Sequence, residues 1–494
     1  MTKITIRRFD RNVVQALTNR GFPEPLARAL AARHVTSPSD LDYEFKEMLS
    51  PWDLKNCKEA GEAIADAIWK QKNIVIIGDY DCDGATAVSV GILGLQALGA
   101  FNVSYLIPDR DKDGYGLSPQ LVDRAAAAGA EFIITVDNGI SSVAAVEHAK
   151  ALGIETVVTD HHLPGDEIPD TLVVNPNQRG DTFPSKSLAG VGVIFYVLIA
   201  VRSALRAKGA YPNGKQPNLQ HLIDLVALGT VADVVPLDRN NRTLVSKGLD
   251  SIRAGKMQPG VSALLSVAGK NAHRICANDL GYILGPRINA AGRLDSINKG
   301  VECLTSYDYN TALFYAKELD QINAERRNRE VSMQSDAILS LQTISVDDSN
   351  SIVLKGDDWH AGIIGLVASR IKEQTYRPVI AFAPSEENGE HVLKGSGRSI
   401  PGIHLRDALD RVSKLKPGLI LKFGGHAMAA GLTIRKDAFD EFKELFARAV
   451  KELSDPEMFE RNIVTDGELR ASDFNIELVE AIRKHVWGQA FPEP

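Results

Sequence analysis

The stretch Asn73-Ile-Val-Ile-Ile-Gly-Asp-Tyr-Asp-Cys-Asp-Gly84 decides the fold class. Its first half, residues 73–78, is short, apolar and rich in β-branched side chains, which is typical of a buried parallel strand. Its second half places Asp79, Asp81 and Asp83 directly after that strand, and an apolar helical pattern follows at residues 85–98. The sequence therefore predicts a strand whose carboxyl end is acidic and which leads into a helix.

Strand-like and helical runs alternate along the rest of the first half of the chain. Further strands are predicted at residues 103–107, 132–136, 156–159 and 172–174, with helices at 120–128 and 143–151 between them. Such alternation indicates an α/β fold with a doubly wound, mostly parallel sheet. Residues 303–343 contain neither proline nor glycine and predict a long helix, and a second βα pattern starts at residue 351.

These patterns predict several domains, because 494 residues are too many for one core. We expect an N-terminal segment (1–50), a catalytic α/β domain (51–300), a bridging helix (301–345), a smaller α/β domain (346–455) and a C-terminal piece (456–494).

The composition is that of an ordinary globular protein, with 44% hydrophobic and 24% charged residues. The start of the chain lacks the pattern of a signal peptide. The apolar run Val191–Val201 is too short to span a bilayer, so it predicts a buried helix and no membrane contact. The four cysteines form no CxxC pair, which favours a reduced, cytoplasmic protein.

Acidic residues and histidines follow three of the predicted strands. Asp137 follows residues 132–136, and Asp160-His161-His162 follows residues 156–159, in addition to the aspartates after residue 78. Because the carboxyl ends of parallel strands meet at one edge of a sheet, five aspartates and two histidines should gather there. Carboxylates packed this closely repel one another unless cations neutralise them. The sequence therefore predicts a divalent metal site.

Hard carboxylate ligands combined with imidazole suit Mn²⁺, with Mg²⁺ as the substitute. Asp233 interrupts an apolar run and also needs a partner, which a metal would supply. The alternative is that strand-end aspartates cap helices or form Asx-turns. The coincidence of three strand ends favours the metal site.

Ordered motifs give the chain a resemblance to the DHH phosphoesterase superfamily. Four lie in the first domain: DYDCDGATA (79–87), VDNG (136–139), DHH (160–162) and GTVADVVPL (229–237). Four later motifs resemble those of the superfamily's single-strand-specific exonucleases: GPRINAAGRL (285–294), WHAGIIGLVASR (359–370), GSGRS (395–399) and GGHAMAAG (424–431). The resemblance runs from about residue 40 to the end and implies a DHH domain followed by a DHHA1 domain.

The resemblance also implies roles for the acidic motifs. Asp79 and Asp81 would bind one ion, Asp83, His161 and Asp233 a second ion, and Asp137 would bridge the two. His162 would contact the scissile phosphate, and Asp160 would orient the histidines. Two cations about 3.5–4 Å apart can clamp a phosphodiester and activate water.

The smaller domain would bind the substrate. Its glycine-rich motifs let backbone N–H groups approach phosphates closely, although such motifs also form ordinary tight turns. The substrate-binding residues implied there are His360, Arg370, Ser396, Arg398, Gly425 and His426.

Four residues of the first domain are implied as further substrate contacts. Arg110 resembles the residue that reads a 5′ phosphate, and Tyr115 could stack on a base. Arg287 and Asn289 lie where a phosphate backbone could pass. The alternatives are a surface tyrosine for Tyr115 and a capping or salt-bridging role for the arginines.

The function implied is a metal-dependent 5′→3′ exonuclease that hydrolyses single-stranded DNA to 5′-mononucleotides in DNA repair and recombination. A single-strand-binding protein and a helicase are the implied partners. The alternatives are a small-substrate enzyme of the same superfamily and a non-catalytic scaffold. Chain length and the later motifs favour the exonuclease over the former, and the complete set of acids favours it over the latter.

The end of the chain carries a last resemblance. Asp466–Leu469 predicts a strand, Ile476–Lys484 predicts a helix, and WGQAFPEP (487–494) resembles the motif that opens an OB-like module. We therefore expect residues 456–494 to be the start of a truncated OB-like module. Since a partial barrel has open edges and little core, we expect it to be mobile or loosely docked.

Overall fold

The computed structural model describes residues 3–109, 116–341, 349–387 and 389–494, so Arg110 and Tyr115 lie outside the described residues. The chain divides into two compact units. The larger unit comprises Arg7–Asn323 and Asp466–Pro494, and the smaller unit comprises strand β1 (Lys3–Ile6) with Ala324–Thr465.

The larger unit is built on a five-stranded sheet in which every pair of neighbours is parallel, with the order β3-β2-β4-β5-β6. The strands are β2 (Ile74–Ile77), β3 (Val103–Leu106), β4 (Phe132–Val136), β5 (Glu155–Thr159) and β6 (Leu172–Val174). The predicted α/β fold with a parallel sheet is confirmed. β2 is buried along its whole length, which explains why it is a continuous apolar run.

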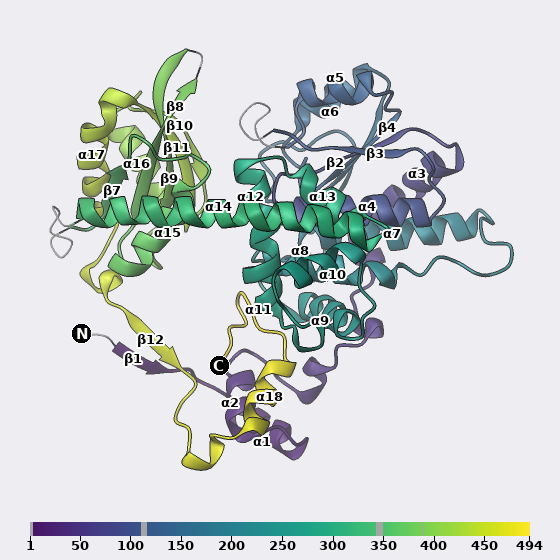
Figure 1. Cartoon of the computed structure of the whole chain (residues 1–494), viewed down its shortest axis with the longest axis horizontal. Helices are drawn as coiled ribbons and strands as arrows, with labels where there is room; N and C mark the ends of the chain where they lie inside the picture. The colour runs from purple at the N-terminus through teal and green to yellow at the C-terminus, as the bar shows by residue number, and fades with distance from the viewer. Residues whose placement is uncertain (1–2, 110–115, 342–348, 388) are drawn as a thin grey trace. The chain divides into compact units, whose positions relative to one another are not determined.

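Helices cover both faces of this sheet (Figure 1). On one face Ile74 and Ile76 pack in the main core with α3 (Cys57–Trp69), α4 (Cys82–Ala97) and α7 (Gly190–Ala207). On the other face Val75 and Ile77 pack with α5 (Pro119–Ala127) and α6 (Val143–Ala151). Successive side chains of a strand point to opposite faces, so one apolar strand supplies both cores.

Helix α4 begins three residues earlier than predicted. Asp81 is its N-cap, and the Asp81 side chain accepts a hydrogen bond from the backbone N–H of Gly84 at 2.9 Å. Asp83 therefore lies in the first helical turn instead of in a loop. Capping the helix start with a carboxylate satisfies one of its unpaired N–H groups.

Helix α7 contains the long apolar run. It has 18 residues and by length and composition could cross a membrane, but 67% of its most apolar window is buried inside the protein. The prediction of a buried helix is confirmed.

The rest of the larger unit is helical. It contains α8 (Ile223–Ala232), α9 (Arg239–Arg253), α10 (Pro259–Val267), α11 (Ala277–Asp279), a π-helical turn η6 (Leu280–Leu284), α12 (Gly285–Leu294) and α13 (Asn298–Thr305). Short 3₁₀ turns lie at Pro38–Leu41 (η1), Phe45–Glu47 (η2), Pro51–Asp53 (η3), Leu219–Leu222 (η4), Ala272–Arg274 (η5) and Ala471–Asp473 (η9).

The long helix α14 (Tyr309–Leu341) leads from the larger unit into the smaller one, as predicted. The smaller unit has a mixed sheet with the order β10-β11-β9-β8-β7, in which only β7 and β8 pair in parallel. Its strands are β7 (Ile352–Lys355), β8 (Val379–Glu387), β9 (Glu390–Arg398), β10 (Ile420–Gly425) and β11 (Ala429–Arg435).

The helices of the smaller unit are α15 (Ile364–Thr375), α16 (Leu405–Leu415) and α17 (Phe439–Glu452), with 3₁₀ turns η7 (Lys436–Ala438) and η8 (Pro456–Phe459). Phe382 packs edge-on against Phe439 and Phe442 in its core. Strand β12 (Asn462–Thr465) pairs in parallel with β1.

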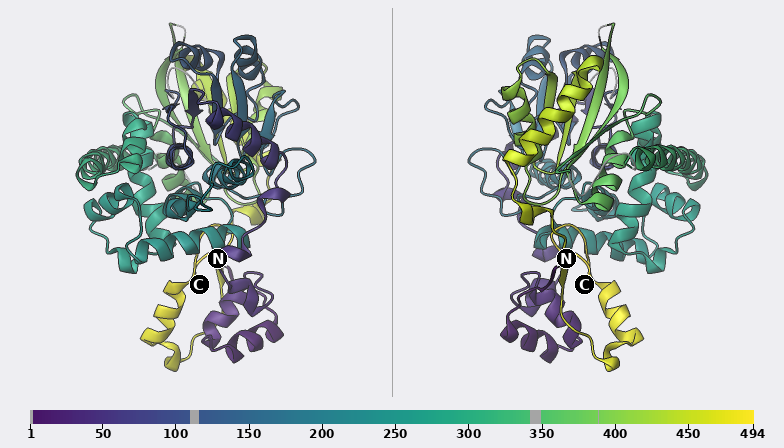
Figure 2. Two further views of the ribbon diagram at one scale, coloured as in Figure 1. Left: turned by 90° about the vertical axis from the view of Figure 1, so that its right-hand side faces the viewer. Right: turned by 90° about the vertical axis from the view of Figure 1, so that its left-hand side faces the viewer.

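The chain begins with helices α1 (Arg11–Asn19) and α2 (Glu24–Ala31), and the C-terminal helix α18 (Ile476–Lys484) contacts α2, beside which it lies in Figure 2. Trp487 and Phe491 are buried in the main core and stack with their ring centroids 5.2 Å apart. Buried Arg33 pairs with Asp466 at 2.8 Å.

The expectation of a loosely docked segment is therefore wrong, because aromatic burial and a buried ion pair hold it. The predicted helix is confirmed at Ile476–Lys484, whereas residues 466–469 form no strand. The described residues 463–494 contain the end of β12, α18 and one isolated bridge, so the OB-like module is not confirmed.

Docking of the C-terminal segment makes a testable prediction. Trp487→Ala should lower the free energy of unfolding by about 3 kcal/mol, because it removes a buried indole and leaves a cavity. Urea unfolding followed by circular dichroism measures this change. Phe474→Ala, in the same segment but 75% exposed, is the control and should change stability by less than about 0.5 kcal/mol. Equal effects of the two substitutions would contradict the docking.

Candidate metal centre

The carboxyl edge of the larger unit's sheet gathers the acidic motifs. Asp79 follows β2, Asp137 follows β4 and Asp160 follows β5, and all three side chains are buried. Asp233 arrives from the end of α8. The structure thus brings together every residue that the sequence proposed as a metal ligand: Asp79, Asp81, Asp83, Asp137, His161 and Asp233.

Three triplets in this cluster place their ligand atoms within 4.8 Å of one another. One is Asp79, Asp81 and Asp137, and the second is Asp83, His161 and Asp233. The third, Asp137 with His161 and His162, overlaps both of the others. Asp137 therefore lies between the two sets of side chains that the sequence assigned to different ions.

The carboxyl groups of the cluster have raised pKa values. Burial, and then repulsion by Asp81, raises the pKa of Asp83 to about 7. Burial and neighbouring carboxylates also raise the pKa of Asp79, Asp137 and Asp233 well above the ordinary value. A cation in the cluster would reverse these shifts, because it stabilises the ionised form of each acid.

His161 fits a metal ligand. Its Nε2 lies 3.0 Å from Asp137 Oδ1 and 3.5 Å from Asp233 Oδ2, and no described residue forms a hydrogen bond with this buried nitrogen. Burial, and then the nearby His162, lowers the pKa of His161 to about 4. A neutral imidazole whose unsatisfied nitrogen faces carboxylates is a suitable ligand for a divalent cation.

His162 has a different environment. Its Nδ1 lies 2.8 Å from Asp160 Oδ1, and Asp160 also accepts the backbone N–H groups of Ile140, His161 and His162. Burial alone would lower the pKa of His162, but the hydrogen bond to Asp160 and the surrounding carboxylates raise it. For Asp160, the same bond outweighs the effect of burial and lowers the pKa. His162 is therefore a fixed, positively chargeable group beside the cluster.

Several residues that support the cluster were not identified from the sequence. The backbone N–H groups of Gly190 and Val191, at the start of α7, donate to Asp83 at 2.7 and 3.0 Å. Asn138 bonds to the carbonyls of Ile77 and Val136 and holds the strand ends together. Asn138 could have been identified, because it belongs to the VDNG motif. The start of α7 could not, because it is distant in sequence from the acidic motifs.

Backbone strain accompanies this arrangement. Asp137 has a φ of 61° and Val234, which follows Asp233, has a φ of 62°. Left-handed conformations cost non-glycine residues about 1–3 kcal/mol and often occur at functional sites. Both strained positions belong to, or adjoin, candidate metal ligands.

Two of the predicted substrate residues in the larger unit have structural contacts. Arg287 is buried and pairs with Asp320 at 2.8 Å, which matches the salt-bridging alternative. Asn289 accepts the backbone N–H of Cys82 at 2.8 Å and so braces the acidic loop. Their roles in substrate binding stay predictions.

The predicted residues of the smaller unit gather around the ends of β9 and β10. Arg398 pairs in register with Ala429, and Gly425 and His426 form the turn that leads into β11. A Cβ on Gly365 would lie 2.9 Å from Ser396 Oγ and 2.9 Å from Arg398 Nη2, so only glycine lets α15 approach these side chains.

Two further predicted residues lie near the same elements. His360 accepts the backbone N–H of Gly362 at 3.0 Å, just before α15. Arg370 is half exposed and pairs with Glu330 and Glu373 at 3.2 and 3.5 Å. These contacts leave the predicted phosphate contacts of both residues untested.

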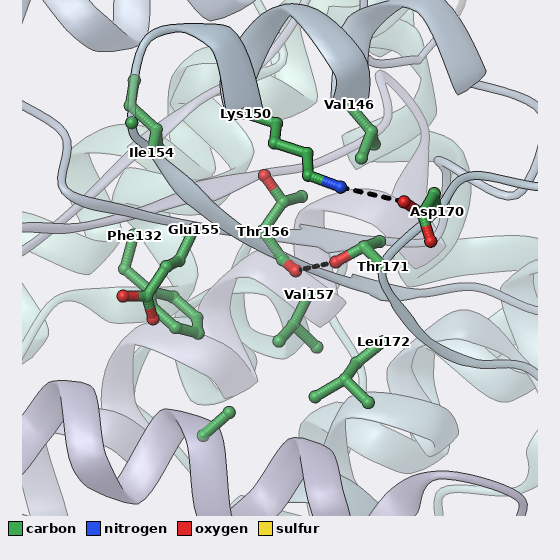
Figure 3. A pocket seen from close by; sticks show the side chains of 12 residues that line it. Phe132, Val146, Lys150, Ile154, Glu155, Thr156, Val157, Asp170, Thr171 and Leu172 are labelled. Atoms are coloured by element: carbon green, nitrogen blue, oxygen red, sulfur yellow. Dashed lines mark hydrogen bonds and ion pairs between the residues drawn. The ribbon is translucent and has the colours of Figure 1, made fainter.

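A pocket of about 400 Å³ lies at the opposite edge of the larger unit's sheet (Figure 3). It is lined by the first residues of the strands, including Phe132, Glu155 and Leu172. Lys150 and Asp170 pair beside it at 2.9 Å, and Thr171 bonds to the Thr156 carbonyl. This pocket is at the amino ends of the strands and takes no part in the acidic cluster.

Metal removal should destabilise the protein in a pH-dependent way. An acid whose pKa is raised in the folded state lowers the free energy of unfolding once it ionises. Because the pKa of Asp83 is raised to about 7, the metal-free protein should lose stability as the pH rises from about 4 towards 7 and beyond. The melting temperature with Mn²⁺ minus that with EDTA should therefore be larger at pH 8 than at pH 5.5. Differential scanning calorimetry measures both values, and a difference independent of pH would contradict a metal site here.

Gly190 offers a test of the cluster that changes no ligand. A Cβ at Gly190 would lie 2.6 Å from Asp137 Cβ, so Gly190→Ala must displace Asp137. We expect the affinity for Mn²⁺, measured by calorimetry, to fall about tenfold or more. Gly165→Ala is the control, because its Cβ would have no neighbour closer than 3.7 Å. Unchanged affinity in Gly190→Ala would argue against Asp137 as a ligand.

Comparisons with known proteins agree with this architecture. Residues 73–230 match the DHH family, N-terminal domain, and residues 348–452 match the DHHA1 domain. The single-stranded-DNA-specific exonuclease RecJ of Salmonella typhimurium is 49% identical over 481 residues, which cover 96% of this chain and 83% of that protein.

Solved structures of RecJ from Thermus thermophilus have the same fold. The structure in complex with Mn²⁺ is 30% identical, with a TM-score of 0.83 over 100% of this chain and 69% of that one. The structure in complex with Mg²⁺ has a TM-score of 0.77, with 29% identity over 100% of this chain and 67% of that one. The fold, the acidic cluster and the likeness along nearly the whole chain lead to one conclusion: this chain belongs to the RecJ family of DHH exonucleases.

Proposed function

We propose that this protein is a divalent-metal-dependent 5′→3′ exonuclease that hydrolyses single-stranded DNA to 5′-mononucleotides in DNA repair and recombination. The observation that carries the proposal is the cluster of aspartates and histidines in which Asp137 belongs to two of the three triplets that could hold a metal ion. Its relatives are named for activity on single-stranded DNA. We further propose that it acts in the cytoplasm, since its four cysteines are free and its proposed substrate is DNA.

The cluster is proposed to hold two ions, Mn²⁺ or in its place Mg²⁺. Asp79 and Asp81 belong to one ion, Asp83, His161 and Asp233 to the other, and Asp137 to both. Bound there, such ions would activate water and neutralise charge on a phosphodiester. Two triplets support this division, Asp79 with Asp81 and Asp137, and Asp83 with His161 and Asp233, because the ligand atoms of each lie within 4.8 Å of one another.

His162 is proposed to act on the scissile phosphate. Its Nδ1 is oriented by Asp160, so the opposite ring nitrogen faces away from that bond. The raised pKa of His162 favours the imidazolium at neutral pH. This cation can stabilise charge that develops on a phosphate oxygen or on the leaving group.

The smaller unit is proposed to bind the DNA strand through His360, Arg370, Ser396, Arg398, Gly425 and His426. In the larger unit, Arg110, Tyr115, Arg287 and Asn289 remain the predicted substrate contacts. We assign catalysis to residues 51–300 and substrate binding to residues 346–455. A single-strand-binding protein and a helicase are the proposed partners, since both expose or present single strands.

A nuclease assay on single strands labelled at either end tests this function. With Mn²⁺ present, the 5′-labelled strand should release labelled mononucleotide at once, while the 3′-labelled strand shortens progressively. EDTA should abolish both reactions, and Asp137→Asn provides an inactive control. Hydrolysis of dinucleotides alone would support a small-substrate enzyme, and no hydrolysis of any substrate would support a scaffold.

His162 provides the sharpest single substitution. His162→Ala should lower kcat by about 100-fold, because a positioned acid or electrostatic contact is lost. Its Mn²⁺ content, measured by elemental analysis, should match that of the wild type. His148→Ala is the control, since His148 lies on α6 and pairs with exposed Asp123 at 2.6 Å. Loss of bound metal in His162→Ala would make His162 a ligand instead.

A further inference from the structure

A second pocket, of about 340 Å³, lies in the larger unit, and one of its lining residues, Val234, directly follows Asp233 in the chain. It lies between the end of α8, the π-helical turn η6 and the C-terminal segment. The residues that matter for its chemistry are Val234, Asn278, Tyr282, Trp487, Gln489 and Glu493. Its volume falls in the range of small-molecule pockets, about 300–1,000 Å³.

Two chain connections tie this pocket to the metal centre. Val234 directly follows Asp233, so neighbouring residues serve the pocket and the cluster. The turn η6 continues into α12, whose Asn289 bonds to the loop that carries Asp79, Asp81 and Asp83. At a helical rise of about 1.5 Å per residue, Tyr282 and Asn289 lie about 10 Å apart along the helix axis.

Tyr282 is placed to contact a ligand and contributes little to the core. Its side chain is 81% exposed and projects from a π-helical turn, a rare conformation that is frequent at functional sites. Val234 beside it is 61% exposed and holds the strained left-handed backbone described above. An exposed aromatic ring next to an exposed aliphatic side chain offers a flat apolar surface.

The polar side chains that line the pocket indicate what kind of ligand it can bind. The side-chain amide of Gln489 can donate and accept hydrogen bonds, and Asn278, whose Nδ2 donates to Glu493 Oε2 at 3.2 Å, still offers its amide oxygen as an acceptor. None of the described residues that line the pocket is a lysine or an arginine, and Glu493 contributes a carboxylate. A phosphate is therefore disfavoured, whereas an uncharged planar ring with polar edges fits.

We propose that this pocket binds a nucleobase of the strand engaged at the metal centre, with Tyr282 stacking on the base. The inference rests on the proposed function and adds a positioning contact to it. Base stacking on an aromatic side chain tolerates any sequence, since every base has a π-face. The pocket thus holds a neighbouring nucleotide while its backbone lies at the acidic cluster.

Substitution of Tyr282 tests the proposal. Tyr282→Ala should raise KM for single-stranded DNA about tenfold or more, whereas Tyr282→Phe, which keeps the ring, should stay within about twofold of the wild type. Tyr307→Ala is the matched control, because Tyr307 is 78% exposed in the same unit and does not line the pocket. Hydrolysis of thymidine 5′-(p-nitrophenyl phosphate), which has no neighbouring base, should be unchanged in Tyr282→Ala.

A strand with one abasic site provides the second measurement. In a set of strands that differ only in the position of the abasic site, one position should raise the KM of the wild-type protein. At that same position, the abasic site should not raise the KM of Tyr282→Ala any further. Additive effects at every position, or wild-type KM in Tyr282→Ala, would overturn the base pocket while leaving the exonuclease intact. Failure of the wild type to degrade single strands would overturn the proposed function and the pocket together.

Discussion

Mutual repulsion among buried carboxylates is the constraint on which this structure depends. Asp79, Asp83, Asp137 and Asp233 converge at one sheet edge, and burial with repulsion raises the pKa of each. No packing of apolar side chains can offset such a cluster, because the ionised form of each acid is the costly one. Divalent cations would remove this cost, because they stabilise the ionised form of each acid, and the same arrangement would then be suited to a phosphodiester.

The backbone around the cluster holds the acidic side chains in place, partly through a strained conformation. The start of α7 directs two N–H groups at Asp83, and Gly190 leaves room for Asp137. Asp137 itself takes a left-handed backbone, which most residues avoid. These features share one effect: they fix carboxylate positions before any ligand binds, which lowers the reorganisation needed when charge develops.

The C-terminal segment (466–494) both contributes to the stability of the larger unit and lines the pocket that contains Tyr282. Arg33 and the stacked pair Trp487 and Phe491 anchor it to the larger unit. The same segment supplies Gln489 and Glu493 to the pocket beside Asp233. Residues that secure the chain end therefore also shape a surface next to the metal centre.

The sequence by itself determined the α/β class, the parallel sheet and the gathering of Asp79, Asp137 and Asp160 at one sheet edge, because each of these acids follows an apolar strand and parallel strands end at a common edge. It also determined α18 to the residue. It could not determine that Trp487 and Phe491 would be buried, since Arg33 against Trp487 and Arg242 against Phe491 lie about 450 and about 250 positions away in the chain. It left open whether Arg287 binds DNA or pairs with a carboxylate, and only the tertiary structure placed Asp320 of α14 beside Arg287. Local sequence patterns indicate which backbone conformation each stretch prefers. Contacts between distant segments depend on how whole helices and strands pack, so only the tertiary structure decided these contacts.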